Sequence, residues 1–366
     1  MQFRAPGRVN IVGEHTDYND GFVLPTTTAA FTTVLAEARD DRTIRIESRS
    51  QSDVLEFSLD DTLPVETPVW SDYARGVAAE IEATGIRLRG ANLRIDGDIP
   101  IGGGLSSSAS FELAIGVSLL DLSDASMAAK ELAQACQRAE VRFAGVNCGI
   151  MDQMAIAACE RDRAMFLDCR TLDATSYRIP DSLRFLVVDS GVRHQLPQSG
   201  YNDRAAECRE AVGILAARSN AITSLRDATI ATLDANAAEL GDTLLRRARH
   251  VITENQRVRD ACDALQQGDQ EKIGNLVSAS HASLRDDFEI SCTPVDDLVV
   301  IANSCDGTFG ARQVGGGFGG CVIVVTSADA VTDVRARIIR DYSAILGMEP
   351  WTHVVSAADP AGRVQE

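Results

Sequence analysis

The sequence Pro100-Ile-Gly-Gly-Gly-Leu-Ser-Ser-Ser-Ala109 joins an alternating segment to a strongly apolar one. Apolar and polar residues alternate over residues 93–99, which predicts a half-buried strand. Residues 105–120 have the composition of a buried helix, and the serines at their start are good N-cap residues. A strand, a glycine turn and a helix in this order point free backbone amides and the positive end of a helix toward an anion. The segment therefore predicts a phosphate-binding loop in a unit of mixed strands and helices.

Two better-known phosphate motifs do not fit this loop. A Walker A loop ends in Gly-Lys-Ser/Thr, and no lysine follows these glycines. The protein-kinase motifs Val-Ala-Ile-Lys and His-Arg-Asp do not occur in the chain. A glycine-rich turn with a serine cap is the alternative that the local sequence leaves open. If the loop binds phosphates, Mg²⁺ must meet much of their charge, because the chain has only two lysines, Lys130 and Lys272.

A second glycine-rich segment, Val314-Gly-Gly-Gly-Phe-Gly-Gly-Cys321, matches the letters of the dinucleotide pattern Gly-x-Gly-x-x-Gly. It leads into the apolar run 321–325, which predicts a strand. A Rossmann turn must lead into a helix instead, so the dinucleotide interpretation is rejected. We expect a loop between two strands that brings backbone close to a ligand.

Apolar periodicity predicts further elements on both sides of the phosphate loop. In the first half we expect a strand at 43–48, a break at 144–149, and helices at 73–84, 127–143 and 150–158. In the second half we expect strands at 183–189 and within 308–325, and helices at 203–218, 243–266 and 331–346. This pattern indicates an α+β fold. A length of 366 residues suggests about two domains, which we place at 1–175 and 176–366.

The start of the chain carries an unusual density of polar chemistry. The segment Gly7-Arg-Val-Asn-Ile-Val-Gly-Glu-His-Thr-Asp-Tyr18 holds an arginine, a histidine and two carboxylates between glycines. Chain starts are usually frayed and chemically plain. The apolar residues Val9, Ile11 and Val12 indicate that this segment is attached to a core while its polar side chains face a ligand. Its histidine and carboxylates can bond to hydroxyl groups, which is what a sugar presents.

The segment 7–18 resembles the signature of the galactokinases, a branch of the GHMP small-molecule kinases. Residues 100–109 resemble the phosphate-binding loop of this family, and residues 314–321 resemble its third motif. The departures are modest: Ile11-Val12 stands where the family usually has Leu-Ile, and fewer residues precede the signature. The resemblance implies two domains, an N-terminal one like domain 2 of ribosomal protein S5 and a ferredoxin-like C-terminal one, with the active site between them. It also implies transfer of the γ-phosphoryl group of MgATP to the anomeric hydroxyl of galactose.

The same resemblance implies which residues act on the sugar. Asp152, in Cys148-Gly-Ile-Met-Asp-Gln153, matches the catalytic aspartate, and Arg8 matches its partner arginine. The implied sugar contacts are Glu14, His15, Asp17, Gly149 and Tyr201. On local grounds Asp152 could instead be an acid that stabilises a helix start, and the carboxylates of the signature could be surface-turn residues. A zinc site at the signature is disfavoured, because no second histidine cluster completes it.

The resemblance further assigns the nucleotide and metal contacts. It places Trp70 near the adenine and places Mg²⁺ on the hydroxyl of Ser108 and the carboxylate of Glu140. The ATP phosphates are assigned to the loop residues Gly102, Gly103, Gly104, Leu105, Ser106, Ser107, Ser108 and Ala109. From the local sequence alone, Glu140 could be a solvated helix residue and Trp70 a core residue.

Composition limits the partners of the chain. The formal net charge of −18 disfavours nucleic acid and anionic membranes as partners. The longest apolar runs are about five residues, far below the ~20 that span a bilayer, and the N-terminus lacks the pattern of a signal peptide. Nine cysteines without a Cys-x-x-Cys pair disfavour a disulfide framework and a zinc ribbon. We therefore expect a cytoplasmic protein, a monomer or weak homodimer, whose partners are galactose and ATP.

Two other functions remain open at this point. The first is a GHMP kinase for another sugar, such as N-acetylgalactosamine or arabinose. The second is a non-catalytic sensor that binds sugar and ATP without transferring phosphate. The intact Arg8 and Asp152 favour the enzyme over the sensor.

Overall fold

The computed structural model describes residues 1–366 except 50–53, 65–68, 193–196, 357 and 366. Its largest sheet is mixed, with only β4 and β6 parallel among the described pairs. The strands run in the order β13 (Gly362–Arg363), β1 (Gln2–Asn10), β3 (Pro25–Ala38), β6 (Ala91–Gly97), β4 (Thr43–Ser48) and β5 (Leu55–Ser58). Along β3, buried Val34 and Ala36 alternate with more exposed residues, because successive side chains of a strand point to opposite faces.

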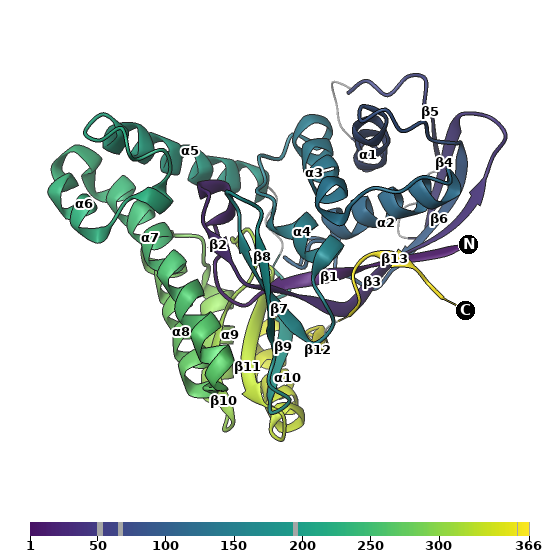
Figure 1. Cartoon of the computed structure of the whole chain (residues 1–366). Coiled ribbons are helices and arrows are strands. Elements are labelled where there is room, and N and C mark those ends of the chain that lie inside the picture. Colours follow the sequence, from purple (N-terminus) through teal and green to yellow (C-terminus); the bar gives the residue numbers. More distant parts are fainter. Residues whose placement is uncertain (50–53, 65–68, 193–196, 357, 366) are drawn as a thin grey trace.

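Helices cover one face of this sheet (Figure 1). They are α1 (Asp72–Glu82), α2 (Ser107–Leu122), α3 (Ala129–Ala139) and α4 (Met151–Ala158). Apolar residues of the sheet, such as Val34 and Leu93, form one core with Leu113 and Leu132 of the helices. The predicted strand at 93–99 and helix at 105–120 are confirmed, each displaced by about two residues.

The predicted helix at 127–143 is only partly regular. After α3 the chain continues as a wider π-helical turn, η2 (Glu140–Ala144), and Gly145 ends it with a φ of 73°. Such turns occur often at functional sites. Buried Phe143 lies against Gly76 of α1, where an added Cβ would come within 2.9 Å of the ring. The wide turn therefore accommodates close packing between helices and also sets the place of Glu140.

A second sheet lies in the lower part of Figure 1 and is antiparallel. Its order is β10 (Thr308–Gln313), β11 (Cys321–Ser327), β9 (Leu183–Asp189) and β12 (Thr352–Val355), and it packs with α8 (Gln270–Asp286), α9 (Thr293–Asn303) and α10 (Val331–Leu346). The predicted strand–loop–strand unit at 308–325 is confirmed by β10 and β11. A third, small sheet has the order β2 (Phe22–Val23), β7 (Arg163–Asp168) and β8 (Ala174–Arg178).

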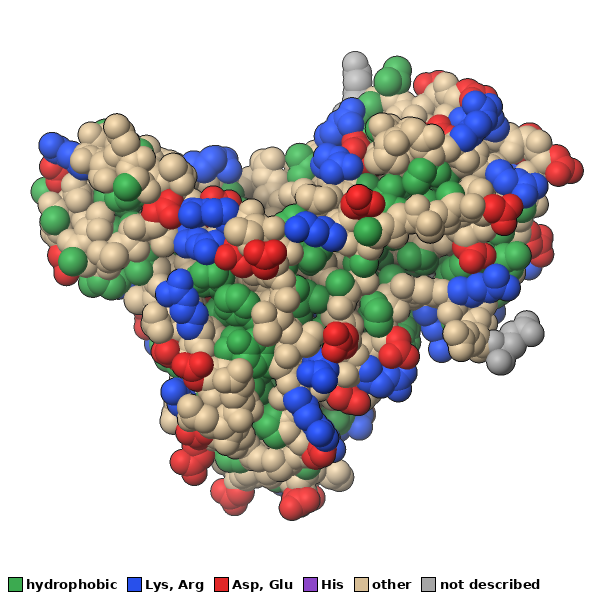
Figure 2. All heavy atoms as spheres, viewed as in Figure 1, with side chains coloured by type: hydrophobic (Ala, Val, Ile, Leu, Met, Phe, Trp, Pro, Cys, Tyr) green, Lys and Arg blue, Asp and Glu red, His purple; other side chains and the backbone are tan. Residues whose placement is uncertain are grey.

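A helical arm extends to the upper left of Figure 1. It contains α5 (Pro197–Ala216), η3 (Leu225–Asp227), α6 (Ile230–Ala235) and α7 (Ala237–Gln267). Near the start of α7, Gly241 has non-helical angles (φ 65°, ψ 173°) and interrupts the helix. The arm has its own apolar core, which includes Leu215, Leu233 and Leu244. Figure 2 shows a notch between this arm and the region around α1 and α3.

The two halves of the chain are closely joined. Residue 175 falls inside strand β8, and near the end of the chain β13 pairs with β1 of the first sheet. Val9 of β1 and Ile11, which directly follows β1, share an apolar core with Phe185 of β9. The division at about residue 175 therefore stays a prediction. Among the helices that the structure describes, none combines the length and apolar character needed to cross a membrane.

Candidate active site

Four segments that are far apart in the sequence surround one cavity of about 140 Å³, here called the central cavity. The walls come from the start of the chain, from the turn between α3 and α4, from α5 and from the glycine loop before β11. The lining residues are Arg8, Glu14, His15, Asp17, Glu140, Val146, Cys148, Gly149, Met151, Asp152, Tyr201, Gly315 and Gly316. The structure thus brings together all the residues to which the family resemblance assigned catalysis or sugar binding.

The phosphate loop forms one edge of this site. Gly102, Gly104 and Ser106 have positive φ angles of 69°, 79° and 59°, which turn the chain sharply from β6 into α2. Glycine is required at 104, because a Cβ there would lie 2.7 Å from the carbonyl oxygen of Val314. The two glycine-rich segments therefore touch. The sequence prediction of a serine N-cap is wrong in one respect: the Ser106 hydroxyl makes no capping bond and donates to Asp152 instead.

Arg8, which is buried, pairs with the partly exposed Asp152 between the loop and the central cavity. Two nitrogens of the Arg8 guanidinium lie 2.8 Å and 2.7 Å from Oδ1 of Asp152. Nη1 of Arg8 also donates to the carbonyl oxygen of Gly104, at 2.6 Å. Oδ2 of Asp152 accepts the bond from Ser106. Asp152 is thus oriented from both sides, and its bonds to Arg8 are charge-assisted, which makes them stronger than bonds between neutral groups.

The sugar-binding candidates line the wall that faces this pair. A Cβ at Gly149 would collide with the carboxylate of Asp17, so only glycine allows this approach. Nδ1 of His15 shares a 2.7 Å hydrogen bond with the hydroxyl of Tyr18, and the Tyr201 ring lies 5.4 Å from the His15 ring. Nε2 of His15 is buried and has no partner among the described residues. That nitrogen and the Asp17 carboxylate are groups that a ligand in the central cavity can satisfy.

Burial changes the protonation of two of these residues. It raises the pKa of Asp17 to about 7, and the nearby charge of Asp152 adds to the effect. It lowers the pKa of His15 to about 3, with a further contribution from His250. At neutral pH His15 is therefore an uncharged imidazole, and Asp17 is close to its midpoint of ionisation.

Glu14 is held by a network from the second half of the chain. Oε1 of Glu14 accepts from the backbone N–H of Gly315 at 2.8 Å and from Nη2 of Arg312 at 3.1 Å. The buried Arg312 guanidinium also donates to the carbonyl oxygens of Asn10 and Ile11, where β1 ends. The signature segment is thus attached to β10 by a charged side chain.

Two further buried residues of α7 hold the same segment. Nε2 of His250 donates to the carbonyl oxygen of Glu14 at 3.0 Å. Oε1 of Glu254 accepts from the N–H of Gly13 at 2.7 Å. Neither residue, nor Arg312, was predicted from the sequence. The only local signals were an arginine within the apolar strand before the second glycine loop, and a histidine and a glutamate one helical turn apart in α7.

Ser108 and Glu140 meet beside the central cavity. The Ser108 hydroxyl donates to Oε1 of Glu140 at 3.0 Å. Glu140 is 7% exposed, so the solvated alternative does not apply. Burial and, secondarily, the charge of Asp152 raise the pKa of Glu140 to about 7. Among the described residues, no arginine or lysine pairs with Glu140, and no group of three or more His, Cys, Asp and Glu side chains could hold a metal. A carboxylate and a hydroxyl suit Mg²⁺, which binds oxygen and takes its remaining ligands from phosphates and water.

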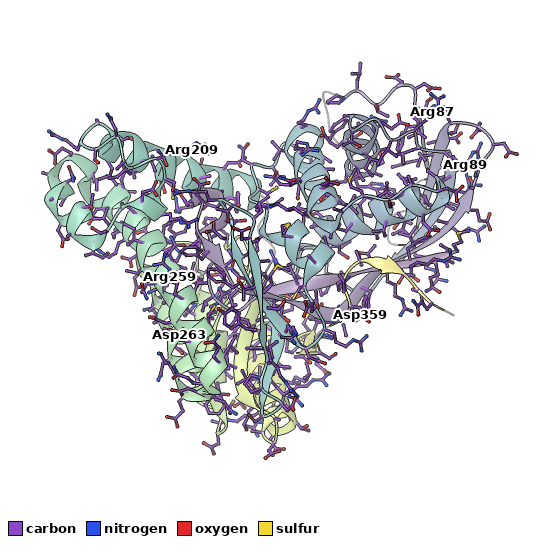
Figure 3. All side chains as sticks on the ribbon, in the orientation of Figure 1. Arg87, Arg89, Arg209, Arg259, Asp263 and Asp359 are labelled. Atoms are coloured by element: carbon purple, nitrogen blue, oxygen red, sulfur yellow. The ribbon has the colours of Figure 1, made fainter. Side chains whose placement is uncertain are left out.

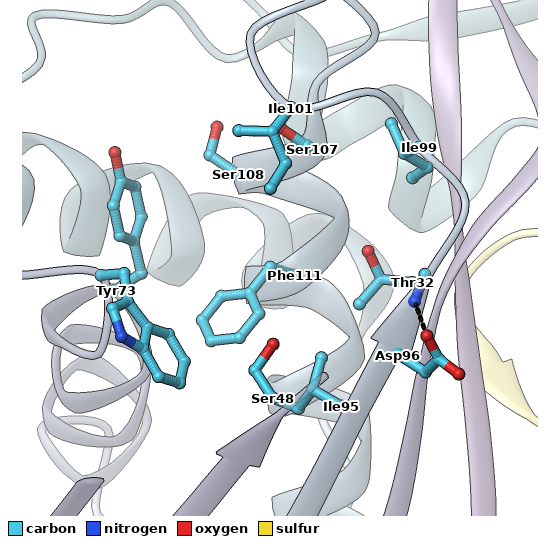
Figure 4. A pocket seen from close by; sticks show the side chains of 12 residues that line it. Thr32, Ser48, Tyr73, Ile95, Asp96, Ile99, Ile101, Ser107, Ser108 and Phe111 are labelled. Atoms are coloured by element: carbon cyan, nitrogen blue, oxygen red, sulfur yellow. Dashed lines mark hydrogen bonds between the residues drawn. The ribbon is translucent and has the colours of Figure 1, made fainter. Parts of the chain in front are cut away.

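A second cavity, of about 290 Å³, lies next to the phosphate loop. Figure 4 shows Tyr73 and Phe111 facing each other across it, with Ser107 and Ser108 at its upper edge. Trp70 also lines it and meets the Phe111 ring edge-on, with centroids 6.1 Å apart. The cavity thus joins an apolar, aromatic wall to the start of α2, an arrangement suited to a flat ring followed by phosphates. Trp70 lies at this wall and also packs against the core.

Comparisons with known proteins agree on one family. The chain matches the galactokinase galactose-binding signature over residues 1–38, the GHMP kinases N terminal domain over 72–160 and the GHMP kinases C terminal model over 261–344. It is 44% identical to the galactokinase of Chloroflexus aurantiacus and 45% identical to that of Chloroflexus aggregans, each over 340 residues that cover 93% of this chain and 87% of the relative.

Solved structures give the same result. The galactokinase of Lactococcus lactis complexed with galactose superposes with a TM-score of 0.94 at 37% identity, covering 99% of this chain and 95% of that one. A mevalonate kinase superposes with a TM-score of 0.68 at 16% identity, covering 99% of this chain and 100% of that one, which shows a shared fold alone. The expected two-domain GHMP kinase fold is confirmed by these matches. The chain therefore belongs to the galactokinases, a family within the GHMP kinases.

Proposed function

We propose that this chain transfers the γ-phosphoryl group of ATP to the anomeric hydroxyl of galactose, giving galactose 1-phosphate and ADP. The observation that carries the proposal is the Arg8–Asp152 pair, which lies between the phosphate loop and the central cavity. Membership of the galactokinases makes ATP the phosphate donor and places the protein among the phosphotransferases. The sugar belongs in the central cavity and the nucleotide in the cavity lined by Trp70 and Tyr73.

The geometry supports a division of labour between the paired residues. Asp152 lies at the start of α4 and faces the cavity. Its carboxylate can therefore accept a hydrogen bond from the anomeric hydroxyl and orient it, or accept its proton as a general base. Arg8 is fixed between Asp152 and Gly104 and can stabilise charge on the transferred phosphoryl group. The amides at the start of α2, within the segment 102–109, are placed to bind the other phosphates.

Ser108 and Glu140 are the residues that would hold Mg²⁺. When bound, the ion would neutralise negative charge on the β- and γ-phosphates. The wide turn η2 keeps Glu140 at the edge of the central cavity, and α2 presents Ser108 beside it. A proton on Glu140 would have to leave before a cation binds, because its pKa is raised to about 7 in the absence of metal.

We also propose partners and a location for the protein. The net charge of −18 favours small-molecule partners over nucleic acid or an anionic membrane. In Figure 3, Arg209 and Arg259 lie far from Arg87 and Arg89, and Figure 2 shows acidic and basic side chains interspersed. We propose a cytoplasmic protein that acts as a monomer or weak homodimer, in keeping with nine free cysteines in the structure.

A direct assay tests the function. ADP release should be measured with MgATP and a panel of galactose, glucose, N-acetylgalactosamine and arabinose. We expect galactose to give the highest kcat/KM, because a site whose polar groups are paired by one sugar leaves them unpaired with its epimer. A higher kcat/KM with another sugar of the panel would identify a kinase for that sugar. Tight binding of galactose and ATP without ADP release would identify a sensor.

The raised pKa of Asp17 predicts a pH dependence of galactose binding. Hydrogen bonds from sugar hydroxyls favour the ionised carboxylate, so binding should release a proton and strengthen as the pH rises through 7. From pH 6 to pH 8 we expect the affinity to rise about tenfold, because the ionised fraction rises by about that factor. Calorimetry without nucleotide, in buffers of different ionisation enthalpy, measures both effects.

The Asp17→Asn variant is the control for this titration. It should bind galactose more weakly and with a flat pH profile.

In the sugar-free parent protein, the raised pKa of Asp17 makes the free energy of unfolding fall as the pH rises from about 4 to about 7. Over this range the folded state keeps a proton that the unfolded chain loses. Equal affinities at pH 6 and pH 8 in the parent protein would contradict the assignment of Asp17.

A further inference from the structure

The residue after Asp152 takes part in a second buried network. Gln153 is 0% exposed, and its side-chain nitrogen donates to Oε2 of Glu140 at 2.7 Å and to Oε2 of Glu112 at 3.2 Å. An amide nitrogen has two hydrogens, so one can serve each carboxyl group. Asp152 and Gln153 are consecutive in the first turn of α4, and they point to different partners. The first turn of α4 thus supplies both the partner of Arg8, through Asp152, and a hydrogen bond to Glu140, through Gln153.

Glu112 has no part in the proposed chemistry, yet it lies deep in the core. It follows Ser108 by one turn of α2 and is 0% exposed. Burial and, secondarily, the charge of Glu140 raise the pKa of the Glu112 carboxyl group well above its ordinary value. Its Oε1 has no hydrogen-bond partner within the described part of the chain. A buried acid in an apolar helix face is costly, which calls for a reason beyond packing.

The hydrogen bonds from Gln153 to Glu140 and Glu112 explain why residue 153 carries an amide. An arginine or lysine at position 153 would pair with Glu140 and compete with a cation for its charge. An amide holds the carboxylate in place without neutralising it. Oε2 of Glu140 is occupied by Gln153, with a long contact of 3.5 Å from the Cys148 thiol, while Oε1 is turned toward Ser108. The carboxylate is therefore fixed at one oxygen and presented at the other.

We propose that Gln153 is a positioning residue that holds Glu140 in the orientation needed to bind the divalent cation, and that Glu112 anchors Gln153 from the opposite side. This inference rests on the proposed metal site at Ser108 and Glu140. It adds to the reaction a neutral amide and a buried acid that touch neither sugar nor phosphate. Their effect reaches the chemistry only through Glu140.

Calorimetric binding of a non-hydrolysable ATP analogue, with Mg²⁺ and with EDTA, separates this role from general stability. Gln153→Leu should weaken binding of the Mg²⁺ complex about tenfold, since it removes a hydrogen bond to a charged group. Binding of the metal-free analogue and of galactose should change less than twofold. Gln137→Leu is the matched control, because Gln137 donates to the Cys148 carbonyl at 3.1 Å in the same region but does not touch Glu140. It should bind the Mg²⁺ complex as the parent does.

Glu112→Leu provides a second test that does not depend on how Gln153→Leu folds. It replaces a buried acid by an apolar side chain of similar size, which cores usually accept. Loss of the anchor should weaken Mg²⁺-analogue binding about fivefold, and the double variant Gln153→Leu/Glu112→Leu should be no weaker than Gln153→Leu alone. Additive effects of the two substitutions would overturn the anchoring role.

Glu140→Gln distinguishes failure of this inference from failure of the metal site. If Glu140→Gln weakens binding of the Mg²⁺ complex and Gln153→Leu does not, Gln153 has no positioning role and the metal site stands. If Glu140→Gln also binds the Mg²⁺ complex like the parent, the metal site itself is wrong, and the role of Gln153 is overturned with it. A loss of galactose affinity in Gln153→Leu equal to the loss of Mg²⁺-analogue affinity would show a merely structural role.

Discussion

Asp152→Asn is expected to slow phosphoryl transfer by about 10²- to 10⁴-fold, the usual contribution of a positioned acid or base. Asparagine keeps the shape of the side chain, so it can still accept from Arg8 through its oxygen. It loses the negative charge that pairs with Arg8 and that can accept the sugar proton. Single-turnover transfer with saturating galactose and MgATP measures the chemical step, and calorimetry measures binding, which we expect to change little.

Two further variants make this result specific. Arg8→Lys should also slow transfer steeply, because a point ammonium cannot reach Asp152 with two nitrogens and Gly104 at once. Asp168→Asn is the matched control: Asp168 pairs with Arg226 in a comparable ion pair, but lines neither candidate cavity. Transfer by Asp152→Asn at the parental rate would make Asp152 a helix-start residue only.

The sequence predicted the parts of the site that are local. The turn at 102–104 requires glycine at particular backbone angles. The alternating residues before it and the apolar residues after it are local patterns, so each can be recognised by itself. The signature 7–18 and the segment 148–153 are contiguous, so their residues could be assigned together. In the structure, residues of 7–18 and of 148–153 line the central cavity, and the glycine turn contacts them where Gly104 accepts from Arg8.

What the sequence could not predict is long-range and buried. Arg312 and Glu14 are separated by 298 positions, and no periodicity links them. His250 and Glu254 lie in a helix whose period was recognised, yet the period does not say that their side chains meet backbone groups of residues 13 and 14. Glu112 lies in α2, a helix whose other residues are mostly apolar, so nothing local indicates its role. Contacts of this kind depend on how whole elements pack, and a local pattern contains no information about that.

Some helices were also missed. No helix was predicted at 270–286 or 293–303, where α8 and α9 lie. The signals were present: Gly268 ends α7 with a φ of 69°, and the side chain of Asp269 caps α8 by accepting from the N–H of Lys272. Gly268 is the C-terminal cap of α7 and Asp269 is the N-cap of α8, so the two helices are joined with almost no loop.

Arg312→Met is expected to lower the free energy of unfolding by about 3 to 5 kcal/mol, the cost of breaking a buried ion pair from one side. Methionine can fill the space of the side chain but donates no hydrogen bond. The carboxylate of Glu14 and the carbonyl oxygens of Asn10 and Ile11 would then lose buried donors. Chemical denaturation followed by tryptophan fluorescence measures the change, with Arg340→Met as the control. Arg340 is 71% exposed and pairs with Asp341, so its loss should cost less than about 1 kcal/mol.

The same variant should lose galactose affinity more than nucleotide affinity, because Arg312 contacts the signature segment and lines neither cavity. Arg312→Lys keeps the charge and provides a folded variant if methionine is too disruptive. It should lie between the parent and Arg312→Met, since an ammonium has three N–H donors and Arg312 donates to four acceptors, the fourth being the carbonyl oxygen of Gln313. Galactose binding normally adds stability by mass action, so the stabilisation that saturating galactose gives should shrink in both variants. If Arg312→Met unfolds at the same denaturant concentration as Arg340→Met and binds galactose as the parent does, the buried arginine does not hold the sugar-binding segment.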